Sequence, residues 1–408
     1  MNVLYWLRSD LRLHDNPALS RFAEIATEGV ILWCPSRSQG RAGAYRRSFL
    51  WATLAEVATE LKARGADVRI YDRDIREVLT KELAGQSFDL IVYNEEPCSE
   101  ERDDESWVHS LGIPCESFEA RTLIPQSQLP FALSALPEVF TVFRKKIEAT
   151  WSVPEPLPSP RRLPGAGVRA ESSGLSLESV LARSDAVHQH LRGGEKAGLA
   201  RLEAYLWKLD RLKSYKETRD GLLDWDDSSK LSPWLAVGAL SPRLIYHDIK
   251  RYEQERVSHE STYWLVFELL WRDYFHWMAC KWGRRLFTGM SSSRPGLKQP
   301  LEAWKQGQTA QAFIDAHMNE LRLTGWMSNR GRQNVANYLV KTLGGDWRLG
   351  AAYFEEQLID YDPASNWGNW AYQAGVGQDP RDRRFDPEFQ ASRYDPEGLY
   401  VARWKSKS

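Results

Sequence analysis

Short apolar runs alternate with longer helical patterns over roughly the first 120 residues of the chain. The strand candidates are residues 3–7, 30–34, 68–71, 90–93 and 115–118. Amphipathic patterns such as residues 44–64 separate these runs and have the period of a helix. Because strands that alternate with helices usually form one sheet covered on both faces, the pattern predicts an α/β domain with a doubly wound parallel sheet.

The periodic pattern weakens after residue 119 and returns at about residue 195. Residues 153–165 contain five prolines, a composition that favours extended, polyproline-like chain over packed structure. Beyond Glu195 the pattern is helical almost to the end. We therefore predict an α/β domain over residues 1–125, a connector over 126–195 and an all-helical domain over 196–408.

Charge and composition limit the classes of protein that remain. The formal net charge is −1, which excludes a uniformly basic nucleic-acid coat, so any DNA binding must use a local basic patch. The four cysteines form no CxxC pair or zinc-type spacing, which indicates reduced thiols and no metal site. No stretch has the length of a membrane span and no signal peptide is visible. We expect a soluble, monomeric, cytoplasmic protein.

The predicted sheet lacks the usual nucleotide-binding motifs. Neither GxGxxG nor a Walker loop is present, which removes the ordinary grounds for placing a dinucleotide or ATP on it. Asn94, Glu95 and Glu96 follow the fourth strand candidate, where ligands of parallel sheets tend to bind. A run of acids at that position is also typical of a solvated loop.

Residues 324–372 carry the densest polar and aromatic pattern of the chain. Asn329, Arg332 and Gln333 are spaced i, i+3 and i+4, so a helix that begins near Met327 would place them on one face. Asp360, an acid that Arg332 could neutralise, lies downstream. The plainer interpretation of Arg332 with Asp360 is a structural ion pair.

Asp362 and Asn366 flank Pro363, which is expected to begin a new helix or turn. The aromatic residues around this segment are more often ordinary core than part of a cofactor site. They include Trp347 and Trp370.

The segment SSKLS, residues 228–232, offers three hydroxyls and a lysine ahead of an apolar helix expected at residues 233–240. A helix N-terminus binds anions readily, so the motif is a candidate diphosphate site. Serine before proline is also a common helix cap with no ligand.

The helix expected at residues 262–282 contains Glu268, Trp271 and Arg272 at i, i+3 and i+4. In most proteins this spacing gives a salt bridge on an aromatic core helix. A ligand pocket on that helix is the alternative.

The motifs TGWMSNRGRQNVANYLV and DWRLGAAYFEEQLIDYDPASNWGNWAY resemble those of the photolyase/cryptochrome flavoproteins. Within that family the chain looks most like the cryptochrome-DASH branch. The similarity extends from LYWLRSDLRLHDNPAL near the N-terminus to YVARW near the C-terminus.

The resemblance implies noncovalent FAD in the helical domain, with Asn366 at the flavin N5 edge and Asp360 and Asp362 near the polar rim of the ring. The residues that match the flavin-binding set are Tyr215, Arg219, Ser228, Ser229, Lys230, Leu231, Ser232, Arg332, Asp360, Asp362 and Asn366. The residues that match the DNA lesion pocket are Glu268, Trp271, Arg272, Asn329, Arg330, Gln333 and Tyr372.

The function implied is photolyase activity, the repair of cyclobutane pyrimidine dimers with single-stranded DNA favoured. In that reaction, excited reduced flavin donates one electron to a flipped-out dimer, and the electron returns after the ring opens. The catalytic set would be Glu268, Asn329, Trp271 and Asn366, with Trp370 and Trp347 in an electron chain. A non-enzymatic blue-light receptor is the main alternative. Repair of (6-4) photoproducts is disfavoured because Ser328, Asn329 and Gln333 stand in the WMSNRGRQ motif where pocket histidines would be needed.

Several positions depart from the family pattern. Arg294 stands where many relatives have the surface tryptophan of the electron chain, and the loop GQTAQAFIDA, residues 307–316, lacks a glycine and a proline of the usual motif. The chain reaches Ser408 soon after YVARW, with no signalling tail in view. The resemblance also implies a folate antenna, such as methenyltetrahydrofolate, in the crevice between the domains, with Glu96 as the matching acid.

Overall fold

The computed structural model describes residues 1–166, 174–185, 188–289, 298–376 and 384–405. Its N-terminal part contains a sheet of five parallel strands in the order β3-β2-β1-β4-β5. The strands are β1 (Asn2–Leu7), β2 (Glu28–Trp33), β3 (Asp67–Ile70), β4 (Leu90–Asn94) and β5 (Cys115–Phe118). The helices between and around them are α1 (Pro17–Ile25), α2 (Arg37–Gly40), α3 (Ala44–Ala63), α4 (Ile75–Gly85) and α5 (Ser99–His109).

Side chains that alternate along β1 show why this sheet is covered on both faces. Val3 and Tyr5 pack into the core with α1 and α3, whereas Leu4 and Trp6 pack into a second core with α4 and α5. Both faces are apolar, as parallel sheets require. The predicted doubly wound sheet is confirmed, and the strand ends differ from the predicted ones by at most two residues.

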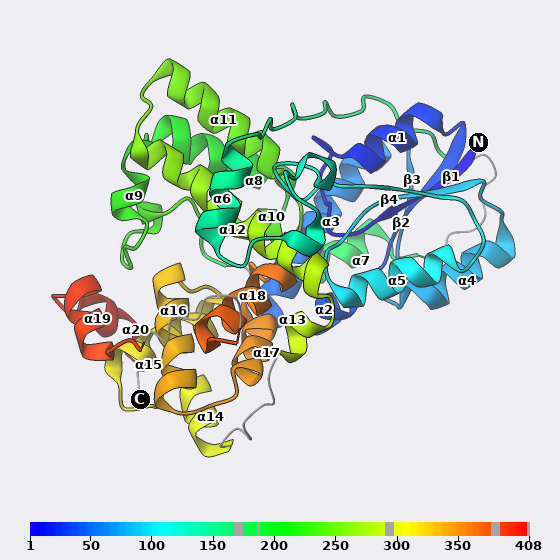
Figure 1. Cartoon of the computed structure of the whole chain (residues 1–408). Coiled ribbons are helices and arrows are strands. Elements are labelled where there is room, and N and C mark those ends of the chain that lie inside the picture. Colours follow the sequence, from blue (N-terminus) through cyan, green and yellow to red (C-terminus); the bar gives the residue numbers. More distant parts are fainter. Residues whose placement is uncertain (167–173, 186–187, 290–297, 377–383, 406–408) are drawn as a thin grey trace.

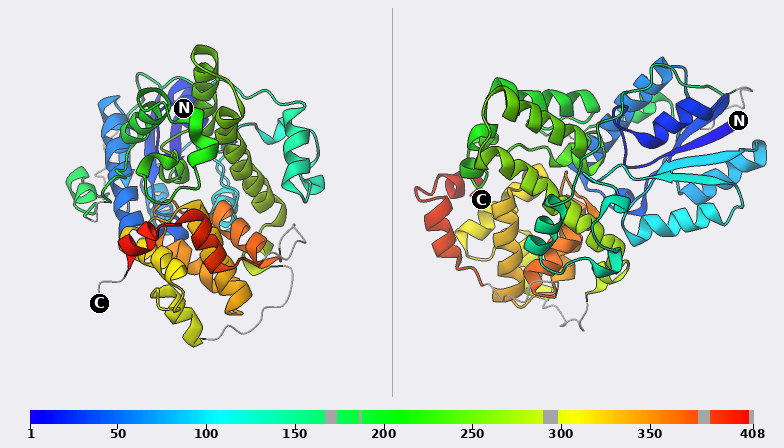
Figure 2. Two further views of the ribbon diagram at one scale, coloured as in Figure 1. Left: turned by 90° about the vertical axis from the view of Figure 1, so that its left-hand side faces the viewer. Right: turned by 45° about the horizontal axis from the view of Figure 1, so that its top comes forward.

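The other regular elements that the structure describes are helices, and none of these is long and apolar enough to cross a membrane. The helices are α6 (Phe140–Glu148), α7 (Leu177–Leu181), α8 (Glu195–Glu203), α9 (Tyr215–Thr218), α10 (Ser232–Ala236), α11 (Pro242–Glu255), α12 (Glu260–Trp282), α13 (Arg285–Thr288), α14 (Lys298–Lys305), α15 (Ala312–Thr324), α16 (Asn329–Asn337), α17 (Trp347–Gln357), α18 (Pro363–Ala374), α19 (Pro387–Tyr394) and α20 (Leu399–Trp404). Helices α8 to α12 form an upper lobe in Figure 1, and α14 to α20 form a lower lobe. Figure 2 shows that both lobes lie to one side of the sheet.

Helix α10 is shorter than the helix predicted at residues 233–240, because Gly238 leaves the helix with φ of +72°. A Cβ at this position would lie 2.0 Å from the carbonyl oxygen of Ser9, so the two backbones could not approach so closely with any other residue. The prediction was wrong in length because a contact with the distant N-terminal domain ends the helix.

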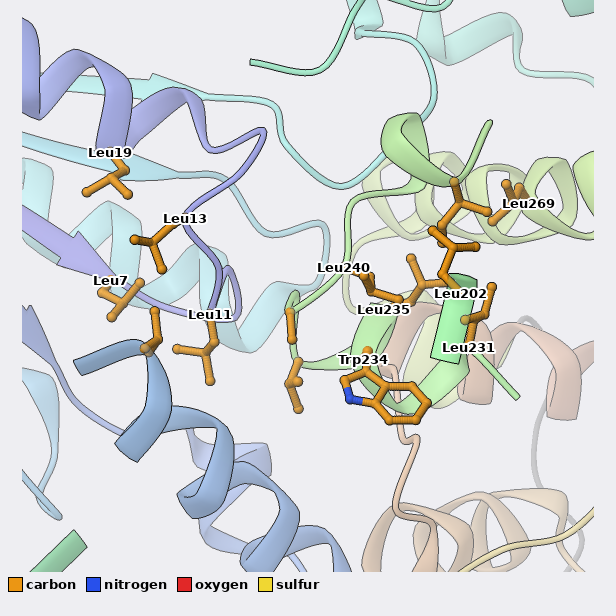
Figure 3. Close-up of a cluster of buried hydrophobic side chains, with 14 of the residues drawn as sticks. Leu7, Leu11, Leu13, Leu19, Leu202, Leu231, Trp234, Leu235, Leu240 and Leu269 are labelled. Atoms are coloured by element: carbon orange, nitrogen blue, oxygen red, sulfur yellow. The ribbon is translucent and has the colours of Figure 1, made fainter. Parts of the chain in front are cut away.

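The hydrophobic core continues across the boundary between the two domains. Leu11 and Leu13, which follow β1, belong to the same cluster as Trp234 and Leu240 of the helical part. Figure 3 shows leucines from the two sides of this boundary in one view, with Trp234 just below Leu235 and Leu240. The two domains therefore share a core and do not merely touch at their surfaces.

The loop between β1 and α1 also supplies the polar contacts of this boundary. Asp15 is fully buried and accepts two hydrogen bonds from the Arg243 guanidinium, both at 2.8 Å. Arg12 donates to the carbonyl oxygen of Gly238 at 2.9 Å. Removing either partner of a buried ion pair leaves an unpaired charge in the interior, which is strongly destabilising. The contacts of this loop therefore fix the sheet relative to α10 and α11.

The proline-rich segment runs as extended chain, as its composition predicts. It has no helix or strand between Thr150 and residue 166. Its backbone bonds to the N-terminal domain: Leu163 donates to the Arg64 carbonyl, and Leu157 accepts from Asp15. Packing against that domain, rather than internal hydrogen bonds, holds it in place.

The loop at residues 307–316, which differs from the expected motif, contains a left-handed residue that is not glycine. Ala310 has φ of +63°. Asp315 holds the loop by accepting hydrogen bonds from the Thr309 amide and hydroxyl, at 2.8 and 2.7 Å. An alanine in this region of backbone space costs about 1 kcal/mol or more relative to glycine.

We expect Ala310→Gly to raise the free energy of unfolding by about 1 kcal/mol, because glycine adopts positive φ without strain. Denaturant midpoints of the two proteins measure the change. The matched control is Ala352→Gly in the middle of α17, which should lower the stability by about the same amount. A destabilised Ala310→Gly variant would contradict the interpretation.

Candidate functional site

A cavity of about 660 Å³ lies between the upper and lower helical lobes. The upper lobe contributes α9, the segment before α10, and α12, and the lower lobe contributes α16, α18 and α19. Of the residues that the sequence predicted for flavin and lesion binding, this cavity is lined by Tyr215, Arg219, Ser228, Ser229, Lys230, Leu231, Ser232, Glu268, Trp271, Arg272, Asn329, Arg330, Arg332, Gln333, Asp360 and Tyr372. Two predicted sets from distant parts of the chain therefore meet in one space.

The carboxylate of Asp360 joins the two lobes at the wall of this cavity. The Arg332 guanidinium donates to both of its oxygens at 2.9 Å, and the Ser232 hydroxyl donates at 2.7 Å. Asp360 is only 6% exposed. Arg332 comes from α16 and Ser232 begins α10, so the predicted ion pair forms and also ties the SSKLS segment to the lower lobe.

The SSKLS segment exposes its polar groups to the cavity in an unusual backbone conformation. Arg201, which lies outside the cavity, donates to the carbonyl oxygens of Ser228 and Ser229 at 3.1 and 2.9 Å. Lys230 has φ of +57°. The carbonyls that would repel an anion are thus bonded elsewhere, while hydroxyls and the lysine remain at the cavity wall.

Lys230 is buried and has no ion pair with the described carboxylates. Its ammonium lies 5.3 Å from the Trp225 ring centre and 5.2 Å from that of Trp326. Burial lowers the pKa of Lys230 to about 8, although Glu320 nearby acts to raise it. A buried, unpaired cation at a cavity wall is chemically suited to a bound phosphate.

Glu268 faces the cavity from α12, paired with Arg219. Its side chain is 28% exposed, and burial raises its pKa above the ordinary value even though Arg219 acts to lower it. We predicted Arg219 for the flavin and Glu268 for the lesion, and the structure brings the two together. The Arg219 guanidinium also lies 5.2 Å from the Trp264 ring centre.

Trp271 lines the cavity one helical turn after Glu268, and Phe140 of α6 stacks on it. The ring centres are 3.7 Å apart and the planes differ by 12°. One face of Trp271 is therefore covered by a residue that no motif indicated. Tyr372 of α18 approaches it edge to face, with ring centres 6.1 Å apart.

Helix α16 begins at Asn329 with Ser328 as its cap, close to the predicted start. Arg330 donates to Gln333 and to Asp220, both at 2.8 Å. Asp220 lies just beyond α9, so this pair is another bridge between the lobes.

A second cavity, of about 90 Å³, continues from the first along α16 and α18. Asn366 and Trp370 line it, and Asn366 donates to the Ala351 carbonyl at 3.0 Å. Asp362 also lines it. Asp362 is paired with Arg121 at 2.9 Å; burial acts to raise its pKa, but Arg121 and Arg272 lower it to about 2.

The two tryptophans of the predicted electron chain lie in one core cluster. Trp370 packs edge to face on Trp304, with ring centres 6.1 Å apart, and Trp347 packs on Trp367 at 5.9 Å. Arg294, at the position of the usual surface tryptophan, lies outside the described residues.

A crevice of about 650 Å³ lies between the domains, lined by residues of α5, α13, α17 and α18. Glu96 is not part of its lining. It is 7% exposed and lies 3.4 Å from Arg121, beside a small cavity of about 40 Å³.

Comparisons with known proteins agree with this arrangement. Residues 3–161 match the family model of DNA photolyase, and residues 264–407 match that of the FAD binding domain of DNA photolyase. A cryptochrome DASH from Gloeobacter violaceus is 43% identical over 427 residues, covering 98% of this chain and 85% of that protein. The chain belongs to the cryptochrome-DASH branch of the photolyase/cryptochrome family. A cryptochrome DASH from Xenopus laevis is 41% identical, with 98% of this chain and 82% of that protein covered.

Solved structures of the photolyase/cryptochrome family superpose over nearly the whole chain. The cryptochrome of Synechocystis sp. PCC6803 matches with a TM-score of 0.92 at 41% identity, covering 99% of this chain and 88% of that one. A bacterial class III photolyase from Agrobacterium tumefaciens matches with a TM-score of 0.86 at 27% identity, covering 99% and 86%.

The residues present fit FAD, the cofactor of this family. The SSKLS segment with the unpaired Lys230 would hold the diphosphate, and the Asp360 and Arg332 pair would face the polar part of the ring system. Asn366 and Asp362, which the sequence also predicted for the flavin, line the adjoining small cavity.

Sequence reasoning missed several cavity residues on the lower lobe. Ser365, Asn369 and Gln373 share a face of α18 with Tyr372, and their spacing of i, i+4 and i+8 could have revealed them. Phe385, Gln390, Arg393 and Tyr394 also line the cavity, from α19 and the residues before it. No motif marked this second group.

We expect Lys230→Met to weaken flavin binding about tenfold or more, because the variant loses the unpaired cation beside the proposed diphosphate. For the wild type, affinity should fall as pH rises through about 8, since Lys230 is charged below that pKa and neutral above it. Burial raises the pKa of Glu320 to about 7, so its ionisation adds to the same fall. Lys230→Met should show a shallower fall.

Equilibrium dialysis with FAD at several pH values measures both effects. Lys305→Met, which removes a distant lysine paired with Glu302, is the matched control. Wild-type affinity for FAD in the Lys230 variant at pH 7 would remove this residue from the flavin site.

Proposed function

We propose that this protein repairs cyclobutane pyrimidine dimers in DNA under blue light and prefers single-stranded substrates. The observation that carries the proposal is that Glu268, Trp271 and the SSKLS segment line one cavity. A flavin bound there supplies light-driven one-electron transfer. The residues of the chain would position the dimer and exclude water around it.

The lesion side of the cavity has the groups that a flipped-out pyrimidine dimer needs. Glu268 would accept hydrogen bonds from the base edges, and Arg219 holds its carboxylate in position. Trp271, supported from behind by Phe140, would stack on the dimer. Asn329 and Gln333 lie across the cavity, where they would read the remaining polar edges, with Arg330 near a phosphate.

A blue-light receptor without repair activity is the second candidate. The similar proteins from Gloeobacter violaceus and Xenopus laevis carry the name cryptochrome. A receptor would not need Glu268 and Trp271 to face an open cavity, which favours repair. A monomeric state and a cytoplasmic location remain expectations from the sequence.

The strand preference follows from the free energy of base flipping. Removing a dimer from a duplex costs a few kcal/mol of unstacking and unpairing, much of which is absent in a single strand. A chain with a net charge of −1 has little general phosphate attraction to offset this cost. The arginines of the cavity are also largely neutralised by carboxylates of the protein itself.

We therefore expect photorepair to be fastest for dimers in single strands, slower in unpaired bubbles and slowest in intact duplex. Measured at matched salt, a duplex made with mismatched bases opposite the dimer should recover part of the difference. Equal rates on all three substrates would show that flipping cost does not set the preference.

Glu268→Gln tests the proposed lesion site directly, because it keeps the size of the side chain and replaces a charged acceptor with an amide. Its repair yield should fall at least tenfold with flavin content unchanged. Glu217→Gln, an exposed substitution on α9, should repair like the wild type. Full repair by the Glu268 variant would place the chemistry elsewhere.

We further propose that the crevice between the domains holds a folate antenna. Its lining combines the rings of Trp367 and Phe287, which suit a flat aromatic ligand, with Arg41 and Arg284. These arginines are paired with Glu100, Glu355 and Asp103, so an anionic tail would have to compete with these acids for them. The purified protein should then show a folate absorption band beside that of the flavin, and Arg284→Ala should diminish only the former. A protein reconstituted with folate that shows flavin absorption alone would contradict this proposal.

A further inference from the structure

Among the arginines that line the cavity, Arg393 differs in having no acidic partner. Arg219 is paired with Glu268, Arg330 with Asp220 and Arg332 with Asp360, and Arg272 lies 3.9 Å from Asp362. No carboxylate of the described residues lies within ion-pair distance of Arg393. Its side chain is exposed at the rim, so its charge is available to a ligand.

Arg393 lies on α19 next to an exposed aromatic ring. Gln390, Arg393 and Tyr394 line the cavity, which turns this face of the helix toward the opening. Phe389 is four residues before Arg393, so the two side chains are neighbours along the helix. Phe389 is 60% exposed, a high value for so large an apolar side chain.

Tyr394 anchors this part of α19 to the rest of the cavity wall. The Arg330 guanidinium lies 4.5 Å from its ring centre and that of Arg393 lies 5.4 Å away. The ring also packs against the small core formed by Phe313, Ala316 and Tyr400. The rim is therefore fixed relative to α15 and α16, as Figure 1 shows for the placement of α19 beside them.

An unpaired guanidinium beside an exposed ring matches the chemistry of one nucleotide in an unpaired strand. The guanidinium would bind a phosphate, and the ring would stack on a base whose face is free. In a duplex the bases are stacked on one another, so the phosphate contact would remain and the stacking contact would be lost. The two side chains would thus discriminate between unpaired and paired strands.

We infer that α19 holds the unpaired strand beside the lesion, with Arg393 on a backbone phosphate and Phe389 stacked on a neighbouring base. The inference rests on the proposed function, because it takes the nucleotide in the cavity to be part of DNA. It adds a second source of strand preference, independent of flipping cost.

Binding in the dark tests this contact without any repair step. Fluorescence anisotropy with labelled single strands that carry one dimer should show affinity reduced about fivefold for Arg393→Ala, with the slope of log Kd against log salt smaller by about 0.7. Phe389→Ala should reduce affinity for single strands by about fivefold and leave duplex affinity unchanged. Arg73→Ala and Leu349→Ala, at exposed positions outside the cavity lining, are the matched controls.

Shortening the oligonucleotide locates the contact. When the nucleotides flanking the dimer are removed from one side, the penalties of both substitutions should disappear on that side only. Unchanged affinity and salt slope in both variants, with a wild type that repairs dimers, would overturn the inference and leave the proposed function intact. A wild type that binds single strands through Arg393 and Phe389 but repairs nothing would support the inference and contradict the proposed repair.

Discussion

The geometry of the cavity depends on the carboxylate of Asp360. Its two oxygens accept hydrogen bonds from Arg332 in the lower lobe and Ser232 in the upper lobe, so a single side chain sets the spacing of the lobes at the cofactor end. The contact is buried, so water cannot replace either partner. Loss of Arg332 or of Asp360 would leave the other charge unpaired, which would destabilise the fold. The SSKLS segment is held in its strained conformation from one side by this contact and from the other by Arg201.

The cavity also shows how a chain with almost no net charge can present a polar, anion-binding space. Most cationic side chains of the wall are paired with acids of the protein, either within one lobe, as with Arg219 and Glu268, or across the two, as with Arg330 and Asp220. These arginines therefore contribute little net potential. Among the described residues of the wall, the cations without an ion pair are Lys230, which is buried, and Arg393, which is exposed at the rim. We therefore expect phosphate groups to bind at two points of the wall and not along a broad surface.

The sequence was informative where the signal was local. Residue spacing along α16 placed Asn329, Arg332 and Gln333 on one face, and the pairing of Arg332 with Asp360 followed from charge alone. Contacts between distant segments could not be read in the same way. The stacking of Phe140 on Trp271 and the pairing of Arg219 with Glu268 each join elements whose relative position only the folded core determines. The position of α19 at the rim of the cavity was missed for the same reason, since Phe389 and Arg393 look like ordinary surface residues in the sequence.

The close approach of Gly238 to Ser9 has a consequence for how this protein could be recombined with its relatives. The loop between β1 and α1 contacts the chain only a few residues beyond Ser232, so the sheet domain and the cofactor wall share one interface. A hybrid that exchanged the α/β domain at the proline-rich connector would replace the loop that contacts α10. It would also place the connector's hydrogen bonds with Asp15 and Arg64 between two parents. Compatible hybrids would need the loop at residues 8–16 and the turn at Gly238 to come from the same parent. These two segments must therefore be exchanged together.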